Sequence, residues 1–172
     1  MEGDQLETEL KTVITDANVL IDYLVTDKKI LKLIPGLFKE ATIPIDVLKE
    51  VEQVTAKQIT ACGFTVYYPD PDTYYKAANS ENGLSFEDNI CIIDSKTNGW
   101  GIITNDTKMR SKCEEEGVEL FWGLQLMVIL VEKGRLSKDE AITAGDKIEV
   151  SNPRITKTDL KRFKAKINAI KI

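Results

Sequence analysis

Four acidic residues lie where the sequence pattern ends a strand or begins a helix. Asp16 closes a short apolar segment and Asp106 closes a β-branched one, and a helix pattern follows each at once. Glu50 lies in the first turns of a helix expected after a strand, and Asp88 lies at the start of another helix. Mg²⁺ and Mn²⁺ prefer oxygen ligands, and clustered carboxylates are costly to keep ionised without a cation. The four residues therefore predict a carboxylate site for Mg²⁺ or Mn²⁺.

Each acid also has a simpler explanation. Asp is a favoured N-cap, which would account for Asp16 or Asp106 taken singly. A negative charge is favourable in the first turn of a helix, which would account for Asp88. Glu50 could be a solvated surface acid, and Glu52 beside it would serve as well. These alternatives stay open at the level of the sequence.

Two further acids, Asp22 and Asp94, are set aside on helical geometry. Asp22 lies six residues beyond Asp16, and Asp94 lies six residues beyond Asp88. Six residues turn an ideal helix through about 600°, so each side chain is expected to point away from the earlier acid. We therefore expect neither in the site.

The composition limits the chemistry that this chain can perform. Its 172 residues include no histidine, which excludes Ser-His-Asp and Cys-His catalysis and histidine-ligated zinc. Apolar residues make up 42% and charged residues 30%, as in an ordinary globular domain. The cysteines Cys62, Cys91 and Cys113 are widely spaced and odd in number, which favours reduced thiols and a cytoplasmic location.

Strand and helix patterns alternate along the first two thirds of the chain. The expected strands are residues 11–16, 40–45, 64–69, 100–105 and 118–121. The expected helices are residues 17–26, 27–38, 46–62, 70–82, 85–99, 106–117, 123–134, 137–148 and 155–172. Helical crossovers predict a mainly parallel sheet, whose strand carboxyl ends form the usual ligand edge. We expect a three-layer α/β/α domain over residues 1–122 and a helical C-terminal extension, residues 123–172, packed on it.

Four segments resemble the motifs of the PIN-domain (PilT N-terminus) nuclease family. "VITDANVLIDYL" resembles the opening strand, acid and helix, and "TIPIDVLKEVE" resembles the second motif, a strand, a proline turn and a helix carrying Glu. "LSFEDNICIIDSK" is similar to the third motif, and "GIITNDTKMR" to the fourth. The resemblance covers about residues 11–122. The segment "FWGLQLMVILVEKGRLSKDEAI" looks like a subgroup with an extended helical C-terminus, known mainly as predicted nucleic-acid-binding proteins.

The resemblance implies a fold, an activity and roles for particular residues. Asp16, Glu50, Asp88 and Asp106 would form the catalytic and metal-binding quartet. Asn18, Thr104 and Asn105 would be supporting polar residues. The family's usual activity is Mg²⁺- or Mn²⁺-dependent cleavage of RNA to 5′-phosphate and 3′-hydroxyl ends. Many members are toxins of prokaryotic toxin–antitoxin pairs, so RNA and an antitoxin protein are the implied partners.

The charge is distributed unevenly. From Arg154 onward the chain carries seven Lys or Arg residues and one Asp, a net charge of +6. Because the whole chain has a net charge of −5, the rest carries about −11. Apolar residues at three- or four-residue spacing in the tail predict an amphipathic helix with a basic face. That face could simply be solvated, or it could bind RNA phosphates or an acidic partner. The candidate nucleic-acid contacts are Lys108, Arg110, Lys161 and Arg162.

No stretch is long and apolar enough to predict a membrane span, and the polar, acidic residues 1–10 are unlike a signal peptide. The apolar residues 123–131 are expected either in the core or at the seam of a homodimer. The leading hypothesis is a metal-dependent ribonuclease, and the second is a catalytically weak PIN-type module that binds nucleic acid or a partner. A phosphoreceiver or haloacid-dehalogenase-like phosphatase is disfavoured, since "DANVL" lacks the second Asp that the phosphatase needs.

Overall fold

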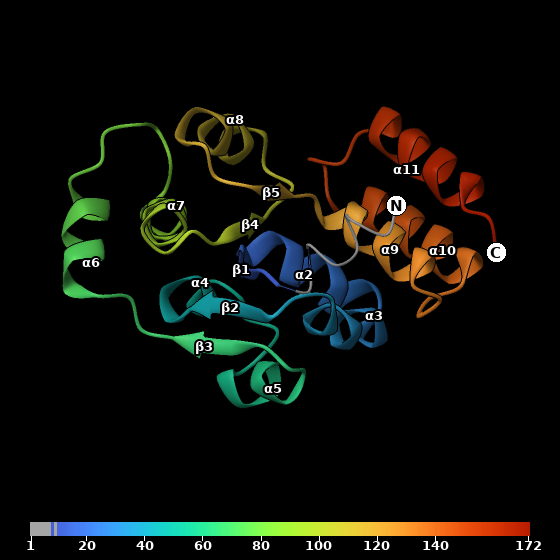
Figure 1. The fold of residues 1–172 in the computed structure, drawn as a ribbon, viewed down its shortest axis with the longest axis horizontal. Coiled ribbons are helices and arrows are strands. Elements are labelled where there is room, and N and C mark those ends of the chain that lie inside the picture. The colour runs from blue at the N-terminus through green and yellow to red at the C-terminus, as the bar shows by residue number, and fades with distance from the viewer. Residues whose placement is uncertain (1–7, 9) are drawn as a thin grey trace.

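The computed structural model describes residue 8 and residues 10–172, so the prediction on residues 1–10 falls almost wholly outside the described residues. The described chain forms an all-parallel, five-stranded sheet with the order β3-β2-β1-β4-β5 (Figure 1). The strands are β1 (Thr12–Thr15), β2 (Glu40–Pro44), β3 (Thr65–Tyr67), β4 (Gly101–Ile103) and β5 (Leu120–Phe121). The α/β class and the parallel sheet are confirmed.

Strand β1 occupies the centre of the sheet. Val13 pairs in register with Ala41 of β2 and with Gly101 of β4. Val13 and Ile14 are fully buried, as expected for a parallel strand covered by helices on both faces. This placement puts the carboxyl ends of β1 and β4 side by side, and so it decides which residues meet at that edge.

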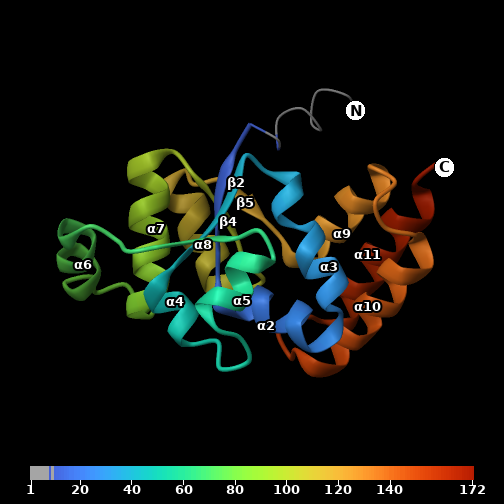
Figure 2. The ribbon, with the colours of Figure 1, turned by 90° about the horizontal axis from the view of Figure 1, so that it is seen from below.

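Helices cover both faces of the sheet. Figure 2 shows α7 and α8 on one side of the strands and α2 and α3 on the other. The helices before the C-terminal extension are α2 (Ala17–Thr26), α3 (Lys28–Leu33), the 3₁₀ turn η1 (Pro35–Leu37), α4 (Ile45–Lys49), α5 (Ala56–Ala61), α6 (Pro71–Ala78), α7 (Phe86–Asn98) and α8 (Thr107–Glu116). The extension contains α9 (Gly123–Glu132), α10 (Lys138–Ser151) and α11 (Lys157–Ala169).

The C-terminal helices pack together and against the domain. Helix α10 contacts α2, α9 and α11, and α9 contacts α11. One hydrophobic cluster includes Ile102 of the sheet together with Leu126, Ile148 and Phe163 of the C-terminal helices. The boundary at residue 122 stays a prediction. Within the described residues, the helices are all too short or too polar to span a bilayer.

The predicted helix over residues 46–62 is wrong in one respect, because it is two short helices. Helix α4 ends at Lys49, and Glu50 is its C-cap. A new helix, α5, begins after Thr55, whose side chain and that of Gln58 form a reciprocal capping box. Glu50 therefore lies at the end of a short helix, before a loop, instead of within a long one.

Candidate functional site

Asp16 and Asp106 lie at the carboxyl ends of the neighbouring strands β1 and β4. The backbone N–H of Asp16 donates to the carbonyl of Ile103, 3.1 Å away. The Thr104 hydroxyl donates to Oδ2 of Asp16 and accepts from the backbone N–H of Asp106 at 3.1 Å. Thr104 thus links the two acids, which fits the supporting position implied for it.

Both acids also cap helices, so the simpler explanation holds for one oxygen of each. Oδ1 of Asp16 accepts from the backbone N–H of Val19 at 2.9 Å. Oδ1 of Asp106 accepts from the backbone N–H groups of Lys108 and Met109 at 2.9 and 3.0 Å. Oδ2 of each carboxylate faces elsewhere: that of Asp16 toward Thr104, and that of Asp106 toward Nε of Arg154, 3.2 Å away.

Asp88 and Glu50 come from two other segments. Asp88 is half-buried in the first turn of α7, where its backbone N–H donates to Oγ of the N-cap Ser85 at 3.0 Å. Glu50 is exposed at the end of α4, a helix that contacts α7. Helix α7 therefore carries Asp88 toward the chain that holds Glu50.

Burial and neighbouring charges raise the pKa of Asp16, Asp88 and Glu50. Burial raises the pKa of Asp16 to about 7, and the charges of Asp88 and Asp22 add to the rise. Burial also raises the pKa of Asp88, and the negative charge of Asp106 contributes. The pKa of Glu50 is raised by partial loss of solvent and then by the charges of Glu87 and Asp88. Asp88 thus links the four acids predicted from the sequence, since its charge acts on Asp16 and Glu50 and the charge of Asp106 acts on it.

The buried thiol of Cys91 lies among the same charges. Burial raises its pKa, and the charges of Asp16, Asp88, Asp94 and Glu50 add to the effect. A thiol in this state stays protonated and is a poor metal ligand or nucleophile. The chemistry of this region therefore belongs to the carboxylates.

The donor chemistry suits a hard divalent cation, but the present side-chain positions do not form a complete cage. Among the described residues, no group of three or more Asp, Glu or Cys side chains is arranged to hold a metal ion. Both oxygens of Asp16 and both oxygens of Asp106 have partners within the chain. The predicted metal role of the quartet stays a prediction.

Asp22, which was set aside from the quartet, is bonded to the residue that precedes Asp106. Its carboxylate is buried and accepts from Nδ2 of Asn105 at 3.2 Å and from Nδ2 of Asn152 at 2.9 Å. Burial raises the pKa of Asp22 to about 6, whereas the two amide donors act in the opposite direction. The helical angle places Asp22 on a different face of α2 from Asp16, but Asn105 and the C-terminal segment cover that face. The available signal was an acid between the apolar residues Ile21 and Tyr23.

Asn105 is held at both ends of its amide. Its Nδ2 donates to Asp22, and its Oδ1 accepts from the backbone N–H of Gly123 at 2.9 Å. A Cβ atom at Gly123 would fall 2.6 Å from Nδ2 of Asn105, so this contact requires glycine. The Tyr23 hydroxyl donates to the carbonyl of the same glycine. The start of α9 is therefore fastened to the residue next to Asp106.

Asn18 and Asp94 have different surroundings. Asn18 is half-buried in the first turn of α2, and its supporting role stays a prediction. Asp94 is buried and accepts from the hydroxyls of Tyr67 at 2.7 Å and Thr73 at 2.6 Å. These bonds join α7 to β3 and α6. Asp94 thus holds α7 to these two elements.

The predicted basic contacts lie on α8 and α11. Lys108 and Lys161 are exposed. The guanidinium of Arg110 lies over the ring of Trp122, 3.4 Å from its centroid. Trp122 also lines a cavity of about 270 Å³ between α9 and α11, together with Arg162 and Lys166. We call Arg110, Trp122, Arg162 and Lys166 the basic aromatic surface.

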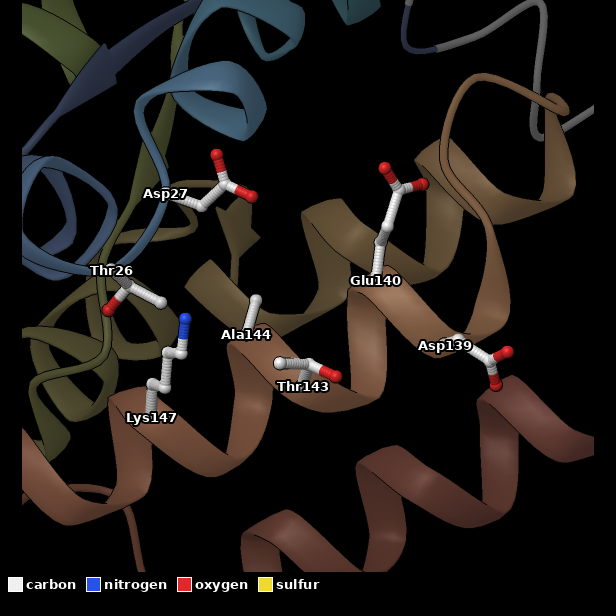
Figure 3. A pocket seen from close by; sticks show the side chains of 7 residues that line it. All are labelled: Thr26, Asp27, Asp139, Glu140, Thr143, Ala144 and Lys147. Atoms are coloured by element: carbon white, nitrogen blue, oxygen red, sulfur yellow. The ribbon is translucent and has the colours of Figure 1, made fainter.

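A second cavity, of about 250 Å³, lies between the end of α2 and α10 (Figure 3). In Figure 3, Lys147 extends toward Thr26, and Asp139 points away from Glu140. Asp27 caps α3, and Glu140 both caps α10 and pairs with Lys29 at 2.6 Å. Both oxygens of Glu140 are already bonded within the chain, and the cavity is lined by none of the four predicted acids, so we do not include it in the candidate site.

No protein-family model and no curated protein sequence matches this chain. The class of protein is defined by the fold: an α/β domain with a parallel sheet of order 3-2-1-4-5. This order is compatible with the PIN resemblance, but dinucleotide-binding folds contain the same order. The residues from the end of β1 into the first turn of α2 are Asp16-Ala17-Asn18, without the glycines that bind a dinucleotide phosphate. Below the level of the fold, the resemblance to the PIN family stays a prediction.

Proposed function

We propose that this protein is a PIN-type, Mg²⁺- or Mn²⁺-dependent ribonuclease. The observation that carries the proposal is that four acids from separate segments lie within electrostatic reach: the charge of Asp88 acts on Asp16 and Glu50, and the charge of Asp106 acts on Asp88. Negative charges this close together are unfavourable neighbours unless a cation neutralises them. Asp16 and Asp106 follow β1 and β4 at the carboxyl edge of the parallel sheet, where such folds bind ligands.

Asp16, Asp88 and Asp106 would hold the cation, with Glu50 as a further ligand or as an acceptor for bound water. When bound, the cation lowers the pKa of its water and offsets the charge that develops on the phosphate. Thr104 fixes the orientation of Asp16 through its hydroxyl. The chain needs no histidine for this chemistry, which agrees with its composition.

The basic aromatic surface supports RNA as the substrate. Arg110 begins the second turn of α8, and its backbone N–H donates to the carbonyl of Asp106 at 3.0 Å, so this surface starts one turn from the site. Cationic side chains bind phosphates, and an aromatic ring can stack on an unpaired base. The surface lies on and beside the C-terminal segment, which carries the chain's excess positive charge, whereas the acidic remainder would repel RNA.

The test is cleavage of mixed single-stranded RNA by the purified protein with Mn²⁺. We expect cleavage that EDTA abolishes and that Asp16→Asn reduces at least 100-fold, since the substitution removes a charged ligand. Asp146→Asn is the matched control, because Asp146 pairs with Lys164 between α10 and α11 and lies outside the quartet. Cleavage that persists in EDTA, or equal loss in both variants, would contradict the proposal.

A second candidate function is a PIN-type module that binds nucleic acid or a partner without useful turnover. It is favoured by the present engagement of Asp106 with Arg154. In that case RNA would bind without being cut, whether or not Mn²⁺ is added. The same assay, read alongside an RNA-binding measurement, separates the two functions.

The proposed partners are RNA and, if the protein is a toxin, an antitoxin protein. The homodimer stays a prediction. Helix α9 would not supply its seam, because the apolar side chains of α9, including Leu126, Met127 and Leu130, are buried within the chain itself. Gene neighbours that encode a small antitoxin-like protein would support the toxin assignment.

A further inference from the structure

Arg154 reaches the candidate site from the C-terminal extension. It lies in the link between α10 and α11, and its Nε is 3.2 Å from Oδ2 of Asp106. The other oxygen of Asp106 is committed to the start of α8. The guanidinium therefore occupies the one carboxylate oxygen of Asp106 that could serve a cation.

The link that presents Arg154 is fixed by its backbone. The backbone N–H of Arg154 donates to Oδ1 of Asn152 at 3.0 Å, while Nδ2 of Asn152 donates to the buried carboxylate of Asp22. The next residue, Ile155, is buried in the hydrophobic cluster. Because the Arg154 side chain takes no part in these bonds, it can move or be replaced while the link keeps its place.

The same bonds close a ring around the site. Asp22 also accepts from Asn105, and Asn105 immediately precedes Asp106. The ring therefore runs from Asn152 through Asp22 and Asn105 to Asp106, and returns through Arg154. This arrangement holds the base of the Arg154 side chain at a fixed place beside the carboxylate, and about half of that side chain remains exposed, at 46%.

We propose that Arg154 is a positioning residue that exchanges between two partners. In the cation-free protein it holds the free oxygen of Asp106, and when a divalent cation takes that oxygen it binds a phosphate oxygen of the RNA. The inference rests on the proposed function. Guanidinium and cation compete because both need the same lone pairs, and a guanidinium binds phosphate as readily as carboxylate.

The size of the effect follows from the exposure of the pair. A partly exposed ion pair such as Arg154–Asp106 adds little free energy to the cation-free protein. Removing it should therefore tighten Mn²⁺ binding about fivefold or less. We expect Arg154→Ala to bind Mn²⁺ about two- to fivefold more tightly than the wild-type protein in calorimetric titration. Arg154→Lys should fall between them, since it keeps the charge but loses the planar donor geometry.

RNA binding should change in the opposite direction. With saturating Ca²⁺ in place of Mn²⁺ to prevent turnover, Arg154→Ala should bind a fluorescent single-stranded RNA about fivefold more weakly. Lys164→Ala is the matched control, because it removes one positive charge from α11 and its partner Asp146 lies outside the quartet. Urea unfolding of each variant checks that the fold is kept.

The outcomes separate this inference from the proposed function. Tighter Mn²⁺ binding together with weaker RNA binding in Arg154→Ala, and neither in Lys164→Ala, supports the exchange. Equal Mn²⁺ affinity in the wild type and Arg154→Ala overturns the exchange while the ribonuclease proposal stands. If neither protein binds Mn²⁺, both proposals fail.

Discussion

The hydroxyl of Thr104 donates a hydrogen bond to the buried carboxylate of Asp16, across the boundary between β4 and β1. The same oxygen accepts from the backbone N–H of Asp106. One short side chain thus sets the orientation of one acid and the backbone position of another. It also satisfies an Asp16 oxygen that burial has removed from water.

Replacing Thr104 should therefore destabilise the protein by more than its size suggests. Thr104→Val keeps the shape but leaves the Asp16 oxygen and the Asp106 N–H without this partner. We expect the free energy of unfolding to fall by about 1–3 kcal/mol, the usual cost of an unsatisfied buried polar group. Urea unfolding in EDTA measures it. Thr104→Ser retains the hydroxyl and should lose far less, and equal losses in the two variants would contradict the assignment.

Asp22 should make stability depend on pH. Its pKa is raised from 3.8 to about 6, so the folded protein binds this proton more tightly than the unfolded chain does. The free energy of unfolding should then fall as pH rises from about 4 to about 6. Above about 6 the destabilisation by the ionised Asp22 should be complete. Urea unfolding at a series of pH values, with EDTA present, should show that Asp22→Asn has a shallower slope than the wild type.

The slope of the free energy of unfolding against pH is the appropriate measure for Asp22→Asn. Asn can accept from Asn105 or Asn152 with a single carbonyl oxygen, so the absolute stability will also change. Asp146→Asn serves as the control, since its side chain is about half exposed, at 49%, and it pairs with Lys164 instead of with buried amides. Identical slopes in the wild type and Asp22→Asn would show that Asp22 is not the titrating group.

The basic aromatic surface should govern RNA affinity through salt. Replacing both Arg162 and Lys166 by Ala removes two positive charges from the cavity that Trp122 lines. Each lost phosphate contact should lower the slope of log affinity against log salt by about 0.7 for a single strand. Fluorescence anisotropy at several salt concentrations measures this slope. Lys29→Ala, whose partner Glu140 lies beside the other cavity, should leave the slope unchanged.

The sequence alone was enough to predict the parallel sheet and the two acids at its carboxyl edge. Strand patterns are short and apolar here, and helix boundaries carry clear caps, such as Ser85 before α7 and the left-handed Gly99 after it. Asp16 and Asp106 follow strands that turn out to be neighbours, so the rule for parallel sheets placed them at one edge. Local signals therefore carried this part of the prediction.

Contacts made across the chain could not be predicted in the same way. The role of Asp22 depends on Asn152, 130 residues later, and the engagement of Asp106 depends on Arg154. Neither partner has a local pattern that marks it. The break after Glu50 was not predicted either. Apolar residues continue at helical spacing through the loop, and this pattern outweighed the capping box of Thr55 and Gln58 that begins a new helix.

The most direct test of the central claim is an anomalous diffraction map of the protein crystallised with Mn²⁺. The account predicts a strong peak about 2.2 Å from carboxylate oxygens of Asp16, Asp88 and Asp106, with Glu50 beside it and Arg154 withdrawn from Asp106. A crystal soaked in Mn²⁺ that shows no peak among these acids, or a peak held by other residues, would contradict the account.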